Sequence, residues 1–402
     1  MIAAKATYAA SRSLEMIKRK ALLITRQTRH RLLLATTFCL AAVVMPHVEA
    51  EDHSDLQNAV GQKIIVGFFG TKPTDPGFRQ VLSNLENGFV GGVLFLGRNI
   101  STVSDLDDMV HELTRCTCAK VPIIAVDEEG GVIERLGANL GLENTPSAAE
   151  IGSRDDDFAE VAYSRLAQKL AGFGFNLDLA PVVDLNVEQA NPIIGRLDRS
   201  YSPSPEVVVA KASILIRELR KQGIASSLKH FPGHGSSLTD SHDGLVDVEK
   251  TWSEKELIPY KSLISSNLAD SVMVGHLSNL DRWGGAATQY GSTAVSEILR
   301  RELRFEGLAI SDDIAMAGAR LPNVELAETI RSSIRTGLDA VIVSRASDED
   351  EGFDTGKFVN DAIVTGVLTG EIDRGDIYAS SNRIALFKSK IVETNHNKLR
   401  SN

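Results

Sequence analysis

Short apolar runs recur along the chain. Each is bounded by Gly, Pro or Asp and is followed by a stretch in which apolar residues repeat every three to four positions. The runs stay apolar without alternating polar positions, a pattern typical of parallel strands that are buried on both faces. We predict eight strands from them, at Lys63–Phe69, Gly92–Leu96, Val121–Val126, Phe175–Leu185, Ala225–Leu228, Ser271–Val274, Gly307–Ile310 and Asp339–Val343.

The segments between these runs predict amphipathic helices, among them Phe158–Gly172, Pro205–Gly223, Trp252–Leu268 and Val295–Phe305. In the first of these helices the residues expected to face inward are Val161, Leu166, Leu170 and Ala171. Eight alternations of strand and helix predict the α/β class and a single closed (β/α)8 barrel of the TIM type. A doubly wound open sheet is the alternative, but its usual Gly-rich phosphate turn is not found at Gly70-Thr71-Lys72-Pro73, after the first strand.

The N-terminal region has the layout of an export signal. Eight basic residues lie before an apolar run at Leu32–Met45, and a small-residue site at Val48-Glu49-Ala50 follows it. The run is shorter than the roughly 20 residues that a membrane-spanning helix needs. We therefore predict a signal segment over residues 1–50, with Met16 as a possible start, and a periplasmic or secreted protein; an uncleaved N-terminal anchor is the alternative. The barrel domain is expected over residues 51–395, with a helix at Ser381–Ile391 and a polar tail at 396–402.

The charge of the chain excludes one class of partner. Its net charge is −10, and because the first 50 residues hold eight basic and two acidic side chains, the rest carries −16. Such an acidic domain is a poor nucleic-acid binder, and it favours a neutral or small substrate. Beyond residue 50 the cysteines are Cys116 and Cys118. A disulfide across one residue is expected to be strained and a metal site needs more ligands, so we predict incidental thiols, with a redox-active disulfide as the alternative.

Polar residues follow almost every predicted strand, which is where barrel enzymes place their chemistry. The third strand leads into Asp127-Glu128-Glu129 and then Arg135; the others end near Asp184, Lys229-His230, His276, Asp312-Asp313 and Ser344-Arg345. Neighbouring residues at a strand end point in opposite directions. Only one carboxylate of Asp312 and Asp313 is therefore expected to face a pocket, and the other to accept a hydrogen bond from a helix terminus or a backbone amide.

The segment KHFPGHGSSLTDSH, Lys229 to His242, is too polar for a core strand and too rich in Gly and Pro for a helix. It ends with Asp240 two residues before His242, and a histidine oriented by a carboxylate is a general acid/base near neutral pH. Gly233 and Gly235 are expected to act as a hinge that closes this loop. A metal hydrolase using His230, His234, Asp240 and His242 is an alternative, although no pair has the helical HExxH frame.

Four motifs together resemble glycoside hydrolase family 3, in its single-barrel β-N-acetylhexosaminidase branch: VDEEGG…ERL at 126–136, NPIIGRLDRSYS at 191–202, KHFPGHGSSLTDSH at 229–242 and ISDDIAM at 310–316. The resemblance implies that Asp312 is the nucleophile and that His242, oriented by Asp240, is the acid/base. It also implies that the substrate sugar is held by Asp127, Arg135, Arg199, Lys229 and His230. No metal or other cofactor is implied.

The resemblance implies a retaining β-N-acetylhexosaminidase, a monomer that removes terminal N-acetylglucosamine from peptidoglycan fragments or related β-linked glycans. A phosphorylase and a catalytically silent sugar-binding protein are the alternatives. Two positions depart from the family pattern: Val132 replaces the arginine of EGGRV, and Ser236 replaces the aspartate of GHGDT. The predicted export also contrasts with the branch's cytoplasmic enzymes of cell-wall recycling.

Overall fold

The computed structural model describes residues 53–285, 290–291, 293–345 and 353–401. The chain divides into two units, Met1–Leu56 and Gln57–Asn402, and every strand of the fold belongs to the second unit. The predicted signal segment at 1–50 lies outside the described residues, so export stays a prediction. Among the described residues, no helix combines the length and the apolar character needed to span a membrane.

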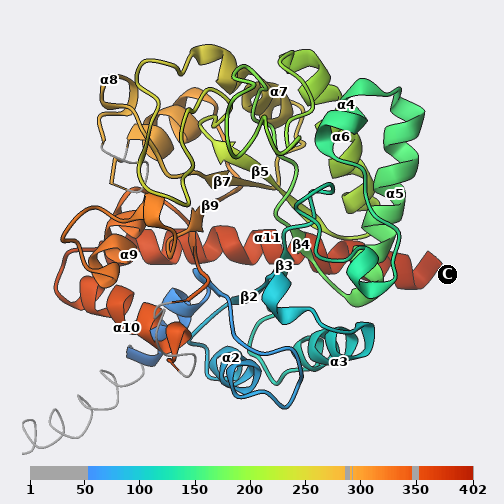
Figure 1. Ribbon diagram of the computed structural model, residues 1–402. Helices are drawn as coiled ribbons and strands as arrows, with labels where there is room; N and C mark the ends of the chain where they lie inside the picture. Colours follow the sequence, from blue (N-terminus) through green and yellow to red (C-terminus); the bar gives the residue numbers. More distant parts are fainter. Residues whose placement is uncertain (1–52, 286–289, 292, 346–352, 402) are drawn as a thin grey trace, which may run out of the picture. The chain divides into compact units, whose positions relative to one another are not determined.

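Eight parallel strands close into a barrel in the order β1-β10-β9-β7-β5-β4-β3-β2. Helices surround it, as the view in Figure 1 shows. The strands are β1 (Ile64–Val66), β2 (Gly92–Phe95), β3 (Ile123–Val126), β4 (Leu177–Asp178), β5 (Ala225–Phe231), β7 (Ser271–Val274), β9 (Leu308–Asp313) and β10 (Ala340–Val343). Each predicted strand is present, so the predicted (β/α)8 barrel is confirmed. The ends of β5 and β9 extend three residues further than predicted, which carries Lys229-His230 and Asp312-Asp313 within the strands themselves.

The α-helices are α2 (Pro76–Glu86), α3 (Val103–Thr114), α4 (Ala148–Ser153), α5 (Asp156–Phe173), α6 (Pro205–Lys221), α7 (Ile258–Ser265), α8 (Leu280–Trp283), α9 (Leu326–Arg335), α10 (Thr355–Leu368) and α11 (Arg374–Ser401). Short 3-10 turns lie at η1 (Gly97–Asn99), η2 (Ala138–Leu140), η3 (Glu254–Leu257) and η5 (Ala317–Ala319), and a π-helix, η4, at Thr293–Glu302. Two short strands, β6 (Val246–Asp247) and β8 (Leu277–Ser278), pair outside the barrel.

Helix α5 illustrates how local sequence sets these elements. Asp155 caps its start by accepting a hydrogen bond from the backbone N–H of Phe158, and Gly174, with φ of 92°, ends it in the left-handed conformation. Its buried residues are Ala159, Tyr163, Leu166, Ala167 and Leu170. The prediction that Val161 faces inward is wrong, because it is 53% exposed, and Ala159, Tyr163 and Ala167 share the inner face with the predicted Leu166 and Leu170.

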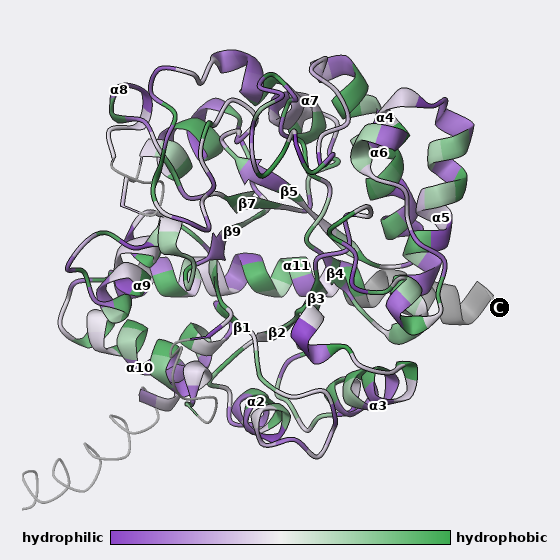
Figure 2. Ribbon diagram, in the orientation of Figure 1, coloured by the Kyte–Doolittle hydropathy of each residue, from purple (hydrophilic) through white to green (hydrophobic). Residues whose placement is uncertain are grey.

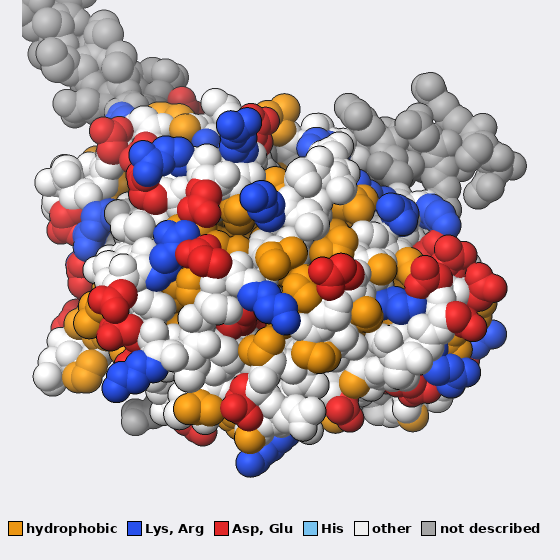
Figure 3. Space-filling view, turned by 90° about the horizontal axis from the view of Figure 1, so that it is seen from above, with side chains coloured by type: hydrophobic (Ala, Val, Ile, Leu, Met, Phe, Trp, Pro, Cys, Tyr) orange, Lys and Arg blue, Asp and Glu red, His pale blue; other side chains and the backbone are white. Residues whose placement is uncertain are grey.

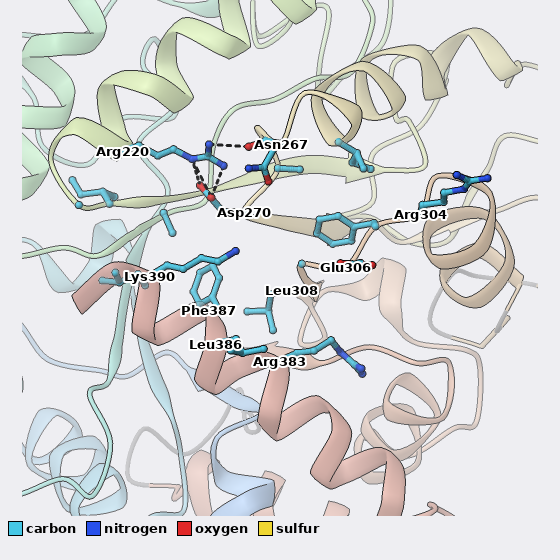
Figure 4. A pocket seen from close by; sticks show the side chains of 18 residues that line it. Arg220, Asn267, Asp270, Arg304, Glu306, Leu308, Arg383, Leu386, Phe387 and Lys390 are labelled. Atoms are coloured by element: carbon cyan, nitrogen blue, oxygen red, sulfur yellow. Dashed lines mark hydrogen bonds and ion pairs between the residues drawn. The ribbon is translucent and has the colours of Figure 1, made fainter. Parts of the chain in front are cut away.

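The barrel interior is filled by apolar side chains from every strand, including Ile65, Leu94, Ala125, Leu177, Met273, Ile310 and Ile342. Ile384, Phe387 and Ile391 of α11 join the same cluster. This helix contains the predicted segment Ser381–Ile391, and polar and apolar residues alternate along it in Figure 2. A cavity of about 600 Å3 lies between α11 and the residues that precede or begin β5, β7 and β9 (Figure 4). It therefore lies at the amino ends of the strands, and it contains none of the predicted site residues.

The cysteine prediction is wrong. Cys116 and Cys118, in the segment between α3 and β3, form a disulfide, and their Cα atoms are 5.2 Å apart. That separation lies within the range that disulfides span, so the single intervening residue does not prevent the bond.

The charged residues on one face of the molecule are mixed in sign. On the face in Figure 3, Lys and Arg side chains are interspersed with Asp and Glu, and no broad basic area gathers there. This face therefore lacks the electrostatic footprint of a nucleic-acid binder.

Candidate active site

A cavity of about 620 Å3 opens at the carboxyl ends of the strands. Seven of the eight predicted site residues line it: Asp127, Arg135, Arg199, Lys229, His230, His242 and Asp312. Asp240 is not part of the wall and lies behind His242. The predicted site residues therefore lie around one cavity at the carboxyl ends of the strands, where barrel enzymes place their active sites.

A buried network of charges forms one side of this cavity. The Nζ atom of Lys229 lies 2.6 Å from Oδ1 of Asp127 and 2.6 Å from Oε1 of Glu129. The guanidinium of Arg199 donates to both oxygens of Glu129, at 2.8 Å each. Each charge has an opposite partner at hydrogen-bond distance, which is what allows the group to remain ionised when buried.

The ion pairs of this network shift the pKa values of Glu129 and Lys229. Burial would raise the pKa of Glu129, but Arg199 and Lys229 hold it far below its usual range. Burial would lower the pKa of Lys229, but Asp127 and Glu129 raise it above its usual value. Lys229 and Glu129 are therefore fixed charges at neutral pH, able to hold sugar hydroxyls but unsuited to proton transfer. Glu129 was not predicted as a site residue, although it lies in the acidic segment that follows the third predicted strand.

His230 is held in one orientation by Asp184. Its Nδ1 lies 2.7 Å from Oδ2 of Asp184, and its Nε2 lies 3.3 Å from the Arg199 guanidinium. Because a guanidinium only donates, Nε2 is the acceptor and the proton sits on Nδ1. Asp184 is fully buried and also accepts from the backbone N–H groups of His230 and His234. It is therefore a positioning residue for the end of β5.

Arg135 is placed by Glu128, which is buried. The backbone N–H of Arg135 donates to Oε2 of Glu128 at 2.7 Å, and Lys169 pairs with the same carboxylate at 3.0 Å. Within the described residues, the Nε atom of Arg135 is buried and has no hydrogen-bond partner. A buried donor without a partner costs free energy, and a ligand in the cavity would supply the missing acceptor.

Asp312 and Asp313 at the end of β9 have different surroundings. Oδ1 of Asp313 accepts from the backbone N–H groups of Ala315 and Ser344, at 3.0 and 2.9 Å, which is the structural role expected for one of the pair. Burial raises the pKa of Asp313. Burial would also raise the pKa of Asp312, but His276 and a hydrogen bond from the backbone N–H of Asp313 hold it below its usual range. Asp312 is therefore the more acidic of the two carboxyl groups, and it is ionised at neutral pH.

His242 and Asp240 form the expected pair. Nδ1 of His242 lies 2.8 Å from Oδ1 of Asp240, and the same oxygen accepts the backbone N–H of His242. Burial would raise the pKa of Asp240, but these two bonds hold it below its usual range. The carboxylate keeps the proton on Nδ1, so Nε2 is the atom that can exchange a proton with a substrate. The His242 side chain is 59% exposed, which leaves it open to solvent in the absence of substrate.

The hinge prediction for the glycines is wrong. In the loop after β5, residues 232–245 (the β5 loop), Gly233 and Gly235 lie in its buried first half. A Cβ on Gly235 would meet the carbonyl oxygen of Leu185 at 1.9 Å, so this glycine allows a close backbone approach. The Asn191 amide donates to the carbonyls of His234 and Gly235, at 2.8 and 3.2 Å. The exposed part of the β5 loop is its tip, residues 238–245.

His234 and Glu256 pack inside the first half of this loop. Nδ1 of His234 lies 2.7 Å from the Ser237 hydroxyl, and burial lowers the pKa of His234 to about 4. Oε2 of Glu256 accepts the backbone N–H of Gly235 at 2.8 Å. Among the described residues, no group of three metal-ligating side chains comes together. His230, His234 and His242 are instead partnered by Asp184, Ser237 and Asp240 respectively.

The two departures from the family pattern lie outside the cavity wall. Val132 is 60% exposed and does not line the cavity, so its missing guanidinium removes no group from the wall. Ser236 is buried beside Glu256 and likewise is not a lining residue. The wall contains arginines that the prediction did not include, at 98, 320 and 345. Of these, the strand pattern points only to Arg345, which follows the last strand.

A closed parallel barrel with ionised carboxylates, a carboxylate-oriented imidazole and a buried lysine around one cavity is the arrangement of a TIM-barrel enzyme. Residues 60–386 match the family model of the glycosyl hydrolase family 3 N terminal domain, and the chain belongs to this family. It is therefore a glycoside hydrolase.

Relatives with known names support the same assignment. The chain is 32% identical over 236 residues to a protein named Beta-hexosaminidase from Photobacterium profundum, covering 58% of this chain and 69% of the relative. It is 30% identical over 330 residues to the Beta-hexosaminidase of Xylella fastidiosa strain M23, covering 78% and 91%. A solved glycoside hydrolase family 3 beta-N-acetylglucosaminidase from Paenibacillus sp. str. FPU-7 superposes with a TM-score of 0.74 at 27% identity, covering 84% of this chain. This chain spans 62% of the length of that protein.

Proposed function

We propose that the protein is a retaining β-N-acetylhexosaminidase that removes terminal N-acetylglucosamine through a covalent glycosyl-enzyme. The observation that carries the proposal is that two side chains with different chemical roles reach the same cavity. Asp312 is ionised at the end of β9, and His242 with Asp240 reaches the same cavity from the β5 loop. Retaining hydrolysis needs these two functions, a nucleophilic carboxylate and a separate proton donor.

The reaction follows from these positions. A carboxylate oxygen of Asp312 attacks the anomeric carbon while the bond from that carbon to the leaving oxygen breaks. His242 in its protonated form gives the proton on Nε2 to the leaving oxygen, and Asp240 stabilises the imidazolium before transfer. The neutral imidazole then takes a proton from a water molecule that attacks the anomeric carbon. That step releases the sugar and restores both residues.

The buried charge network is suited to hold the sugar during these steps. Asp127 accepts and Lys229 donates hydrogen bonds at fixed positions, and His230 is kept in one tautomer beside Arg199. The free Nε–H of Arg135 adds a donor that has no other partner among the described residues. Fixed polar groups of this kind orient a bound sugar with little reorganisation during the reaction.

The substrates we propose are peptidoglycan fragments. The lining arginines 98, 320 and 345 add positive charge to a wall whose acids are already paired or assigned to catalysis. A muropeptide carries carboxylates on its peptide stem, which guanidinium groups bind with charge-assisted hydrogen bonds, whereas a chitin disaccharide is neutral. Product analysis on N-acetylglucosamine-containing muropeptides and chitobiose, side by side, tests this. We expect release of N-acetylglucosamine with a higher kcat/KM on the muropeptide, and a preference for chitobiose would contradict the substrate proposal.

A phosphorylase is the second candidate, because an imidazole acid does not repel phosphate as a carboxylate would. Comparing turnover with and without inorganic phosphate, and identifying free sugar or sugar 1-phosphate as the product, separates the two activities. We further propose that the enzyme is an exported monomer. N-terminal sequencing of the mature protein from cell fractions tests the export, and size-exclusion chromatography with light scattering tests the oligomeric state.

A further inference from the structure

We propose that Gly318 is a positioning residue that latches the tip of the β5 loop, and with it His242, onto the segment that follows Asp312. This inference rests on the proposed function. The backbone N–H of Gly318 donates to the carbonyl of Ser241 at 2.9 Å. Ser241 immediately precedes His242 and is itself buried, although most residues of the tip are exposed. The latch therefore acts one residue from the proposed acid/base.

The contact has no room for a side chain. A Cβ on Gly318 would lie 2.5 Å from the carbonyl oxygen of Ser241 and 3.0 Å from that of Gly244. Both atoms are backbone, so neither can rotate away as a flexible side chain would. Gly318 does not have a positive φ, so a substitution here would not strain the backbone conformation. Its only expected effect is the steric clash with these two carbonyl oxygens.

Gly318 is in turn fixed relative to the nucleophile. Nε2 of His276 donates to the carbonyl of Asp313 at 2.9 Å, and the backbone N–H of Met316 donates to the same oxygen at 3.0 Å. The N–H of Ala319 then donates to the carbonyl of Met316 at 3.1 Å. A short, tightly hydrogen-bonded stretch of chain thus connects Asp312 to the latch, and the latch connects it to His242.

The tip needs such a contact because its own packing is poor. Leu238 is 62% exposed and the His242 side chain 59% exposed, whereas the first half of the loop is held by Asp184, Asn191 and Glu256. A segment with few buried contacts opens locally at low free-energy cost. The bond from Gly318 selects the arrangement in which His242 lines the cavity.

The test is Gly318→Ala with Gly172→Ala as the matched control. Gly172 lies in α5, and a Cβ there would meet nothing within 4 Å. We expect Gly318→Ala to lower kcat/KM about tenfold to a hundredfold on a muropeptide, whose leaving group needs protonation, because misplacing a catalytic group by about 1 Å costs up to ~10²-fold. On an aryl N-acetylglucosaminide with a nitrophenol leaving group, kcat/KM should change less than about twofold, because that leaving group needs little help from an acid.

Three results would overturn the latch. Equal losses on both substrates mean general damage to the site, and wild-type kinetics mean that Gly318 positions nothing. The third result comes from amide hydrogen exchange of the unmodified protein, so it does not depend on the folding of a variant. We expect the Gly318 amide to be protected from exchange and the amides of Leu238 and Thr239 to exchange quickly. A Gly318 amide that exchanges at the rate of an open loop rejects the latch.

Failure of the latch and failure of the proposed function give different results. If the unmodified protein hydrolyses neither substrate, or if Asp312→Asn remains active, the proposed function fails. If the unmodified protein is active, Asp312→Asn is inactive and Gly318→Ala behaves as Gly172→Ala does, only the latch fails.

Discussion

Lys229 bridges two carboxylates in the wall of the active site, with Nζ 2.6 Å from Asp127 and 2.6 Å from Glu129. Glu129 is shared with the Arg199 guanidinium, so a single acid holds two buried cations. The cavity thus has a wall of fixed charge that is complete before a sugar binds. Glu129 is therefore the acid that both buried cations of this wall share.

Replacing Glu129 with Gln should destabilise the fold. The variant leaves Arg199 without its buried counter-ion, and breaking one partner of a buried ion pair costs roughly 3–5 kcal/mol. Chemical denaturation at pH 7 measures this loss, with Glu143→Gln as a control because Glu143 pairs with Arg165 on the exposed surface. Equal effects of the two substitutions would contradict the role given to Glu129.

The same residue predicts a loss of stability in acid. Its pKa is lower in the folded protein than in the unfolded chain, so its contribution is present above the unfolded value of about 4.5 and is lost as pH falls below it. The unfolding free energy of the unmodified protein should therefore fall more steeply below pH 4.5 than that of Glu129→Gln. Parallel curves for the two proteins would reject this assignment.

Glu256 predicts the opposite dependence. Burial raises the pKa of Glu256 to about 7, so the folded protein holds a proton that the unfolded chain has released. The contribution of this proton to the unfolding free energy is fully present below pH 4.5 and is lost as pH rises to about 7. The loss is up to about 3 kcal/mol, because each pKa unit corresponds to about 1.4 kcal/mol. Glu256→Gln is neutral at every pH and keeps an acceptor for the N–H of Gly235. The difference in unfolding free energy between variant and unmodified protein should grow in favour of the variant between pH 5 and pH 8, and a constant difference would count against a protonated Glu256.

Substitutions of Asp312 and of Asp313 should have different effects, the first on turnover and the second on stability. Asp312→Asn keeps an acceptor for the backbone N–H of Asp313 but removes the nucleophile, so turnover should be lost with Tm nearly unchanged. Asp313→Ala leaves two partly buried amides, those of Ala315 and Ser344, without their acceptor, at up to roughly 1–3 kcal/mol each. Its main effect should be a lower Tm. Thermal unfolding and turnover of both variants check this, and the reverse pattern would exchange the two roles.

His242→Ala should discriminate between leaving groups. General acid catalysis contributes about 10²–10⁴-fold, and that contribution matters only when the leaving oxygen needs a proton. We expect a loss of this size in kcat/KM on a muropeptide and a much smaller loss on a nitrophenyl N-acetylglucosaminide. Because His242 is exposed, Tm should not fall, which makes the unfolding temperature the internal control. Equal losses on the two substrates would exclude His242 as the acid.

The barrel could be predicted from the sequence because its strands are buried on both faces. Runs such as Ile123–Val126 and Ala340–Val343 contain no polar residue, so the hydrophobic pattern predicts each of them as a strand, and each forms one. The sequence pattern ends β5 and β9 too early because Lys229 and Asp312 are ionisable. Their charges lie within strands because the carboxyl ends of a barrel face the active site rather than the core.

The features that the sequence did not predict depend on pairing in three dimensions. Nothing local marks Glu129 as the partner of Arg199, 70 positions away. Gly233 and Gly235 suggested a hinge, but these glycines are required by close contacts with Glu256 and Leu185, which no local pattern reveals. The prediction for Val161 fails because Ala159, Tyr163 and Ala167, which are only weakly hydrophobic, share the buried face of α5 with Leu166 and Leu170.

The most direct test of the central claim is the configuration of the first product. We would follow hydrolysis of a nitrophenyl N-acetyl-β-glucosaminide by NMR at early times, before the released sugar mutarotates. If Asp312 forms a glycosyl-enzyme, N-acetylglucosamine appears first as the β anomer, and Asp312→Asn releases no sugar on the same time scale. Initial release of the α anomer would show direct attack by water, and would contradict the role given to Asp312.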